Sequence, residues 1–278
     1  MDIFPLNLVL TVAVASTTIF LGFLPTRNIR SPFFAQEIFK ALGAWVFIAI
    51  FSPPGIQHYY FFIAILCFGS WWQFRRDKAL SGKMWLSIAS GLGISIGVML
   101  ILAVTPRAYP PGLSNLSQTL LLASIYLGGA VIGLAYISYA LIQGSHASSG
   151  ATKDQVQRYI GLLPILVLAR AGVLLALVFL TPGSGLIKYR EYDLPKTQST
   201  YHLFGHEFTG ITFGYAQDIS FPLQTTLLLG LAVVILPLLT FAVHRAISRH
   251  LQVQAATMLA GICLLGLLAE ILARLSLL

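Results

Sequence analysis

Two charged side chains lie deep inside long apolar segments, where an ionised group needs a partner or water. Arg170 stands near the middle of segment 158–181, and Glu270 lies in segment 254–276. A lone charge at the centre of a bilayer costs about 2.5–3.5 kcal/mol on insertion scales. We predict that Arg170 pairs with Glu270, because their offset of roughly 7.5 Å along the helix axes is within reach of an arginine. Arg274, one helical turn after Glu270, is the rival partner.

This charged pair suits either of two roles. As a structural ion pair it would fix the register of two helices. As a functional site it would place Arg170 and Glu270 at a proton path or at the polar end of a ligand pocket. Both roles stay open at this point.

A second group of polar side chains suits hydrogen bonding to a quinone headgroup. Tyr136 and Tyr139 are three residues apart in one apolar segment, and His146 follows the end of that segment. Hydroxyls and imidazoles near a membrane interface can hold the quinone oxygens, while aliphatic walls accept its tail. The same side chains can instead reach toward the interface without any ligand. Other polar residues of this group are Gln36, Glu37, Gln118, Tyr126, Ser138, Gln143 and Ser145.

The positions of the histidines argue against a bound haem. A membrane cytochrome b needs imidazoles that face each other inside the membrane. The histidines of this chain lie at segment ends or in one long loop: His58, His146, His202, His206, His244 and His250. On a helix, His202 and His206 would share a face beside Glu207, but a lone spacing of this kind is a weak metal signal. No metal site is predicted.

The elements that position these residues are predicted to be membrane-spanning helices. The chain has 278 residues, of which 57% are hydrophobic and 9% charged, against roughly 25% charged residues in soluble domains. This composition excludes a water-soluble enzyme, a disordered chain and a nucleic-acid-binding domain. We predict an all-α, polytopic bundle that forms a single transmembrane domain over 1–278. Its eight spans lie at about 5–24, 35–52, 58–73, 84–105, 118–143, 158–181, 222–243 and 254–276.

Two features of the predicted topology are the short third span and the distribution of the basic residues. Span 58–73 is short, and a re-entrant hairpin made by 35–52 and 58–73 is the alternative reading. Eleven of the 17 Lys and Arg lie in or beside the loops after the odd-numbered spans. Because basic loops stay cytoplasmic, both termini are expected outside, in a bacterial inner membrane or a photosynthetic membrane. The net charge of +8 therefore reflects topology and attraction to anionic lipid rather than nucleic-acid binding.

Only one connection between the predicted spans is long. Residues 182–221 form an extracytoplasmic loop, and its length and aromatic content predict a folded cap over the bundle. No other part of the chain is built as a soluble domain, so a globular catalytic part would come from partner subunits. We find no convincing internal repeat in the sequence.

Glycines and prolines mark the expected helix contacts and kinks. Gly93 with Gly97, and Gly129 with Gly133, each form a GxxxG pattern that lets helix backbones approach closely. Pro237, like Pro164, is expected to disturb the helix that contains it.

The architecture resembles the membrane-anchor subunits of dimethyl sulfoxide reductase and, more distantly, the polysulfide-reductase membrane subunit superfamily. The resemblance covers the whole chain as topology. Two short stretches are also similar to the family: the small-residue run from Gly128 to Gly133 and the closing run from Leu267 to Arg274. The long outer loop departs from the family's pattern.

The resemblance implies a subunit that anchors electron-transfer partners at the membrane and offers quinol a pocket. Electrons would pass to an iron–sulfur or haem subunit encoded elsewhere, and no cofactor would be bound covalently here. Glu270 would accept a proton with Arg170 beside it. Tyr136, Tyr139, His146 or His58 would hold the quinone. A structural or assembly subunit without its own chemistry and a small-solute transporter are the two alternatives.

Overall fold

Helices make up the body of the molecule. The computed structural model describes residues 4–27, 29–108, 115–145, 153–180, 188–193, 198–203, 206–211, 215–220, 223–249 and 251–275. Its helices are α1 (Phe4–Phe23), α2 (Ser31–Phe51), α3 (Pro54–Arg75), α4 (Ala79–Ala108), α5 (Asn115–Ser145), α6 (Lys153–Leu180), α7 (Leu223–Leu229), η1 (Gly230–Ile235), α8 (Leu236–Ser248) and α9 (Gln252–Leu275). Each predicted span corresponds to one of these helices or, for 222–243, to the run from α7 through η1 to α8.

Within the described residues, seven helical segments are long and apolar enough to cross a membrane, as expected for a multi-pass membrane protein in a lipid bilayer. The remaining long helix, α3, is not among the seven, since its ends are rich in polar and aromatic residues. Its 22 residues rise about 33 Å, which matches the hydrocarbon core. That α3 forms an eighth span, and that both termini face outward, stay predictions.

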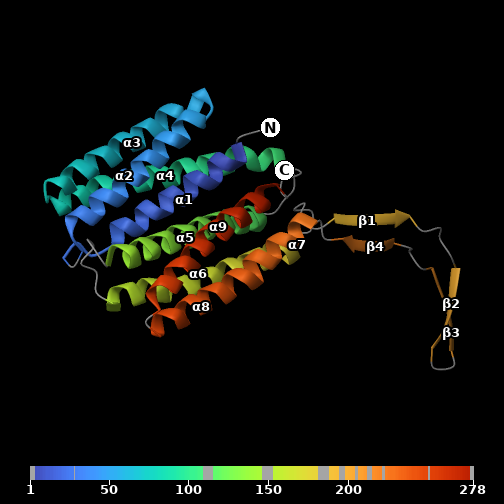
Figure 1. The fold of residues 1–278 in the computed structure, drawn as a ribbon. Coiled ribbons are helices and arrows are strands. Elements are labelled where there is room, and N and C mark those ends of the chain that lie inside the picture. The colour runs from blue at the N-terminus through green and yellow to red at the C-terminus, as the bar shows by residue number, and fades with distance from the viewer. Residues whose placement is uncertain are drawn as a thin grey trace.

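The long helices form two rings of four. In the first ring α1 and α3 each contact α2 and α4, and in the second α5 and α8 each contact α6 and α9. The rings meet along α1 and α5, which lie side by side in Figure 1. Although the sequence shows no repeat, both halves therefore have the same order of neighbours. Short connections favour this arrangement because they place consecutive helices antiparallel and adjacent.

Glycines allow the two rings to approach each other. A Cβ added to Gly129 or Gly133 of α5 would press against residues 12–17 of α1, including backbone atoms. Gly93 and Gly97 of α4 leave room for α1 and for aromatic side chains of α2 and α5. Both GxxxG patterns thus mark close helix contacts, as predicted.

Pro237 follows a wide turn of helix. The six residues Gly230–Ile235 are π-helical, and Pro237 stands at the start of α8. Proline lacks an N–H and its ring clashes with the carbonyl one turn earlier, so the wider turn gives it room. The disturbance predicted at Pro237 therefore takes the form of a π-bulge. At Pro164, by contrast, α6 continues without a break from Lys153 to Leu180.

The membrane bundle is all-helical as predicted, and segment 182–221 adds four short strands outside it. Strand β1 (Lys188–Asp193) pairs with β4 (Tyr215–Ser220), and β2 (Gln198–Leu203) pairs with β3 (His206–Ile211), both antiparallel. Figure 1 shows these strands beyond the ends of the helices, whereas a folded cap over the bundle was expected. His202 is opposite Glu207 in the β2–β3 register, so the H-x-x-x-H-E run does not lie on a helix.

Three tyrosine hydroxyls of the second ring donate hydrogen bonds to the first ring. The acceptors are the Ile94 carbonyl for Tyr126 at 2.8 Å, Glu37 Oε2 for Tyr136 at 2.7 Å and the Phe23 carbonyl for Tyr159 at 3.2 Å. Together with the α1–α5 contact, these bonds orient one ring against the other.

The Tyr126 bond gives a small, testable contribution to stability. Tyr126→Phe keeps the ring but removes the donor to Ile94, so we expect the free energy of unfolding to fall by about 1 kcal/mol. Thermal unfolding of the purified protein in detergent measures this change. Tyr59→Phe is the matched control, because Tyr59 is 51% exposed and donates no hydrogen bond within the described part of the chain. Equal unfolding midpoints for the two variants would contradict the prediction.

Candidate functional site

Arg170 and Glu270 form the predicted ion pair. Nη2 of Arg170, on α6, donates to Oε1 of Glu270, on α9, at 2.5 Å. Arg170 is 1% exposed and Glu270 is 3% exposed. Breaking a buried ion pair of this kind by removing one residue is strongly destabilising. The side chain of the rival partner, Arg274, lies outside the described part of the structure.

Gly128 of α5 makes room for this pair. A Cβ at Gly128 would overlap the carboxyl group of Glu270. Both α6 and α9 pack on α5, so three helices meet where the two charges lie. The sequence marks Gly128 as the start of a small-residue run, but it does not connect this run with Glu270. The sequence shows which residues are small, but it does not show which neighbouring helix or side chain approaches them.

The arginine is only partly satisfied by its neighbours. Nε and Nη1 of Arg170 are buried and have no hydrogen-bond partner among the described residues. Buried donors of this kind cost about 1–3 kcal/mol each when they stay unpaired. The pair therefore carries a free-energy cost that an apolar pair of side chains would avoid.

A second buried carboxylate, Glu37 of α2, links the two rings. It is 5% exposed, and its Oε2 accepts the hydrogen bond from Tyr136 at 2.7 Å. Its Oε1 accepts from Lys40 Nζ, also at 2.7 Å, and the Lys40 side chain is 49% exposed. The three residues thus connect a hydroxyl between the rings to the surface. Glu37 and Tyr136 are both recognisable in the sequence as polar residues in apolar segments, but their contact depends on how the rings meet.

A pocket of about 380 Å³ lies between α5 and α9. Its polar lining comes from Tyr139, Gln143, Gln252 and Thr257, and its apolar lining from Ile142, Val253, Ala256 and Ala260. Tyr139 follows Tyr136 by three residues, so the pocket lies about one helical turn from the Glu37 pair. This mixture of amide, hydroxyl and aliphatic surface suits a small amphiphilic ring.

The other predicted site residues are not brought together with this pocket. His58 is exposed in the first turn of α3, with its ring centroid 4.0 Å from that of Tyr59. It lies just after the end of α2, whereas Glu37 lies near the start of that helix. His146 lies outside the described residues. Along α5, Gly128 and Tyr139 are separated by about 16 Å, so the Arg170–Glu270 pair and the pocket are distinct centres.

Nothing outside the chain identifies either centre. Among the described residues, no group of three or more His, Cys, Asp or Glu side chains is arranged to hold a metal ion. Comparisons with protein-family models, with curated proteins and with solved structures found no match. The function is therefore inferred from the geometry of this membrane protein alone.

Proposed function

We propose that this protein is an integral membrane subunit of a multi-subunit redox complex that binds quinol in the α5–α9 pocket. The observation that carries the proposal is the spacing of two tyrosines on α5. Tyr139 lines the pocket, and Tyr136, three residues earlier, donates to the buried carboxylate of Glu37. A headgroup held at Tyr139 would therefore lie close to a hydroxyl–carboxylate pair that can take up a proton.

The residues of the chain divide the work of quinol oxidation between them. Tyr139 and Gln143 orient the headgroup by hydrogen bonds, and the aliphatic side chains of α9 exclude water from it. Each quinol releases two protons and two electrons. Tyr136 passes a proton to Glu37 as it receives one from the quinol side, and Lys40 opens a route from Glu37 to the surface. The two electrons leave to an iron–sulfur or haem subunit supplied by another chain.

The Arg170–Glu270 pair has a different place in this proposal. Glu270 is a proton acceptor by its chemistry, and Arg170 donates a hydrogen bond to its carboxyl group. Because Glu270 lies far from the pocket, Glu37 is the better first proton acceptor. Glu270 would accept the proton at a later step of the path. In the alternative role, the pair only holds α6 and α9 together. Stability measurements on variants of the pair test this role.

Purification from the native membrane in mild detergent tests the anchor function first. We expect redox-cofactor subunits to co-purify and extracted quinone to be stoichiometric. Partners without redox cofactors would instead identify a structural or assembly subunit. A lone chain without quinone would contradict the proposal and favour a small-solute transporter.

Substitutions in the same preparation test the pocket and its proton acceptor. Glu37→Gln and Tyr139→Phe should each lower the rate of quinol oxidation, by about 100-fold for Glu37→Gln, because a positioned acid or base contributes on that order. Steady-state assays with a soluble quinol analogue measure these rates. Asp77→Asn is the matched control, since Asp77 is an exposed acid that does not line this pocket. A Glu37→Gln rate equal to that of Asp77→Asn would rule Glu37 out as the acceptor.

A further inference from the structure

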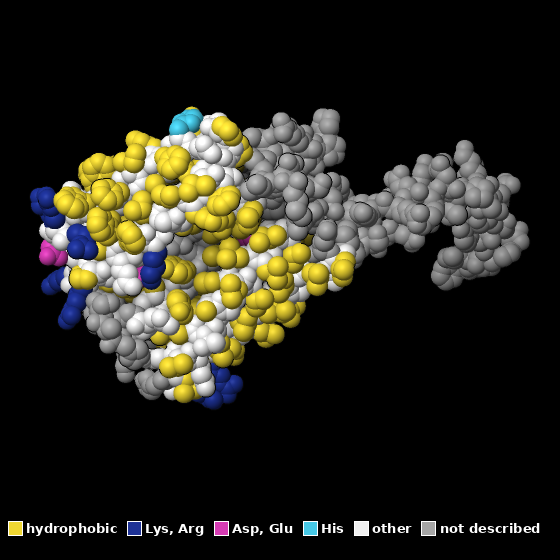
Figure 2. Space-filling view, turned by 45° about the horizontal axis from the view of Figure 1, so that its top comes forward, with side chains coloured by type: hydrophobic (Ala, Val, Ile, Leu, Met, Phe, Trp, Pro, Cys, Tyr) yellow, Lys and Arg dark blue, Asp and Glu magenta, His cyan; other side chains and the backbone are white. Residues whose placement is uncertain are grey.

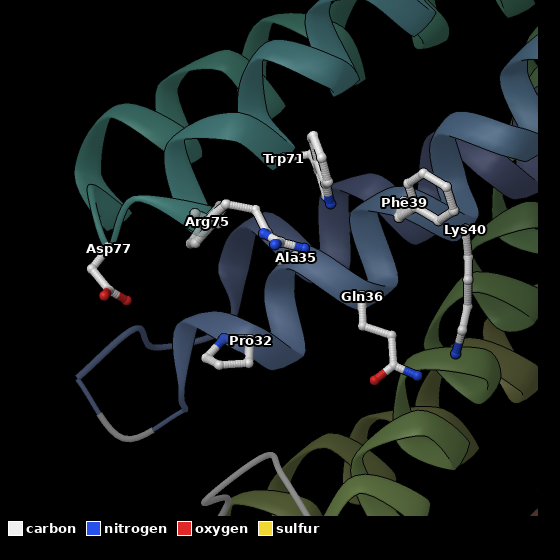
Figure 3. A pocket seen from close by; sticks show the side chains of 9 residues that line it. Pro32, Ala35, Gln36, Phe39, Lys40, Trp71, Arg75 and Asp77 are labelled. Carbon is white, nitrogen blue, oxygen red and sulfur yellow. The ribbon is translucent and has the colours of Figure 1, made fainter.

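We propose that the groove between α2 and α3 binds the headgroup of an anionic phospholipid. The groove has a volume of about 690 Å³ and opens between the start of α2 and the end of α3. Figure 3 shows its lining, which combines basic, amide and aromatic side chains: Gln36, Phe39, Lys40, Trp71, Phe74 and Arg75, with Pro32, Ala35 and Asp77. This volume is within the range of about 300–1,000 Å³ that is usual for small-molecule sites.

Arg75 is the residue that would hold the phosphate. Its guanidinium group reaches from α3 toward Ala35 of α2 (Figure 3). Its guanidinium carbon lies 5.4 Å from the centroid of the Trp71 ring, which orients the side chain. It forms no ion pair with any carboxylate in the described part of the chain. A planar guanidinium group held in this way can donate two parallel hydrogen bonds to a phosphodiester.

The other charges of the groove leave Arg75 as its main anion-binding group. Lys40 is already paired with Glu37 at 2.7 Å, so it contributes hydrogen-bonding capacity more than net charge. Asp77 also lines the groove, but it forms no ion pair with Arg75 in the described part of the chain. Gln36 adds a neutral donor on the α2 side. The set favours one negatively charged group at Arg75.

The surroundings of the groove are basic. The connections next to it and the adjoining helix ends carry seven basic residues against two acidic ones, Glu37 and Asp77: Arg27, Arg30, Lys40, Arg75, Arg76, Lys78 and Lys83. Figure 2 shows several dark blue side chains gathered at the left side of the view, next to the yellow surface. Basic pockets between membrane helices at this depth are typical sites for anionic headgroups.

Aromatic side chains continue from the groove along the apolar outer surface. The Phe39 ring lies 6.0 Å from the Trp71 ring, and the Phe68 ring lies 5.4 Å from it, measured between centroids. Phe39 is 59% exposed and Phe68 is 50% exposed, so acyl chains can pack on both. A polar, cationic site that opens onto such a surface fits an amphiphile better than a free anion.

Native mass spectrometry of the full-length protein tests the lipid and the residue. The protein would be equilibrated in mixed nanodiscs of phosphatidylglycerol and phosphatidylcholine and then released for analysis. We expect phosphatidylglycerol to be retained about fivefold over phosphatidylcholine, and Arg75→Gln to remove that preference, because one basic residue near an anionic headgroup contributes about that factor. The comparison of the two lipids on the unsubstituted protein needs no variant.

Arg76→Gln is the matched control, since Arg76 is also exposed, lies 4.5 Å from the Trp72 ring centroid and does not line the groove. It should retain phosphatidylglycerol within about twofold of the unsubstituted protein. Equal loss in both variants would show a general surface-charge effect and overturn the groove. Equal retention of both lipids would also overturn it. Displacement of the lipid by excess inorganic phosphate would assign the groove to free anions instead.

Discussion

Arg170→Met is expected to lower the free energy of unfolding by about 3–5 kcal/mol, the cost of leaving a buried charge without its partner. Glu270 is 3% exposed, so water cannot replace the lost guanidinium group. The thermal midpoint in detergent, together with the amount of protein that reaches the membrane, measures the change. A control is Arg245→Met on α8, where the arginine is exposed and forms no ion pair within the described residues.

The double variant Arg170→Met/Glu270→Leu separates the structural role from the chemical one. It removes both charges and the two unpaired donors of Arg170, so most of the lost stability should return. If quinol oxidation is still lost in this stable variant, the pair has a chemical role. If quinol oxidation is retained, the pair serves only to hold α6 and α9 together. A double variant as unstable as Arg170→Met would contradict the cost assigned to unpaired charge.

The ion pair could be predicted because depth in the membrane follows from position in a span. Arg170 and Glu270 are the residues whose burial demands a partner, and their depths agree within the reach of an arginine. The role of Gly128 could not be predicted in the same way. It depends on which face of α5 is turned toward α9, and a run of small residues does not specify which neighbouring helix it faces.

The residues predicted to bind quinone show the same limit: their chemistry could be predicted from the sequence, but their neighbours could not. Spacing places Tyr136 and Tyr139 on one face of a helix, and the structure puts Tyr136 beside Glu37 and Tyr139 in a pocket wall. His58 has equally suitable chemistry, but it belongs to the first ring and lies far from that pocket. The assignment of helices to two rings, with α1 against α5, arises from contacts between distant segments. Hydropathy indicates where the membrane helices start and end, but it does not indicate which helices pack against each other.

Gly128→Ala is expected to lower the free energy of unfolding by about 1–3 kcal/mol, the usual cost of overpacking. The added methyl group would occupy the space of the Glu270 carboxyl group, so the carboxylate must move and its bond to Arg170 must lengthen. Thermal unfolding in detergent measures the loss. Gly172→Ala is the matched control, because Gly172 lies on α6 near Arg170 and a Cβ there meets nothing within 4 Å.

The Glu270→Ala background shows whether this loss arises from the carboxyl group. With that group removed, Gly128→Ala should cost much less, because the two substitutions act on the same contact and are not additive. An undiminished cost in this background would mean that the methyl group disturbs the packing of α5 against its other neighbours. In that case the small residue at position 128 would serve helix contact alone, and Glu270 would not depend on it for its position.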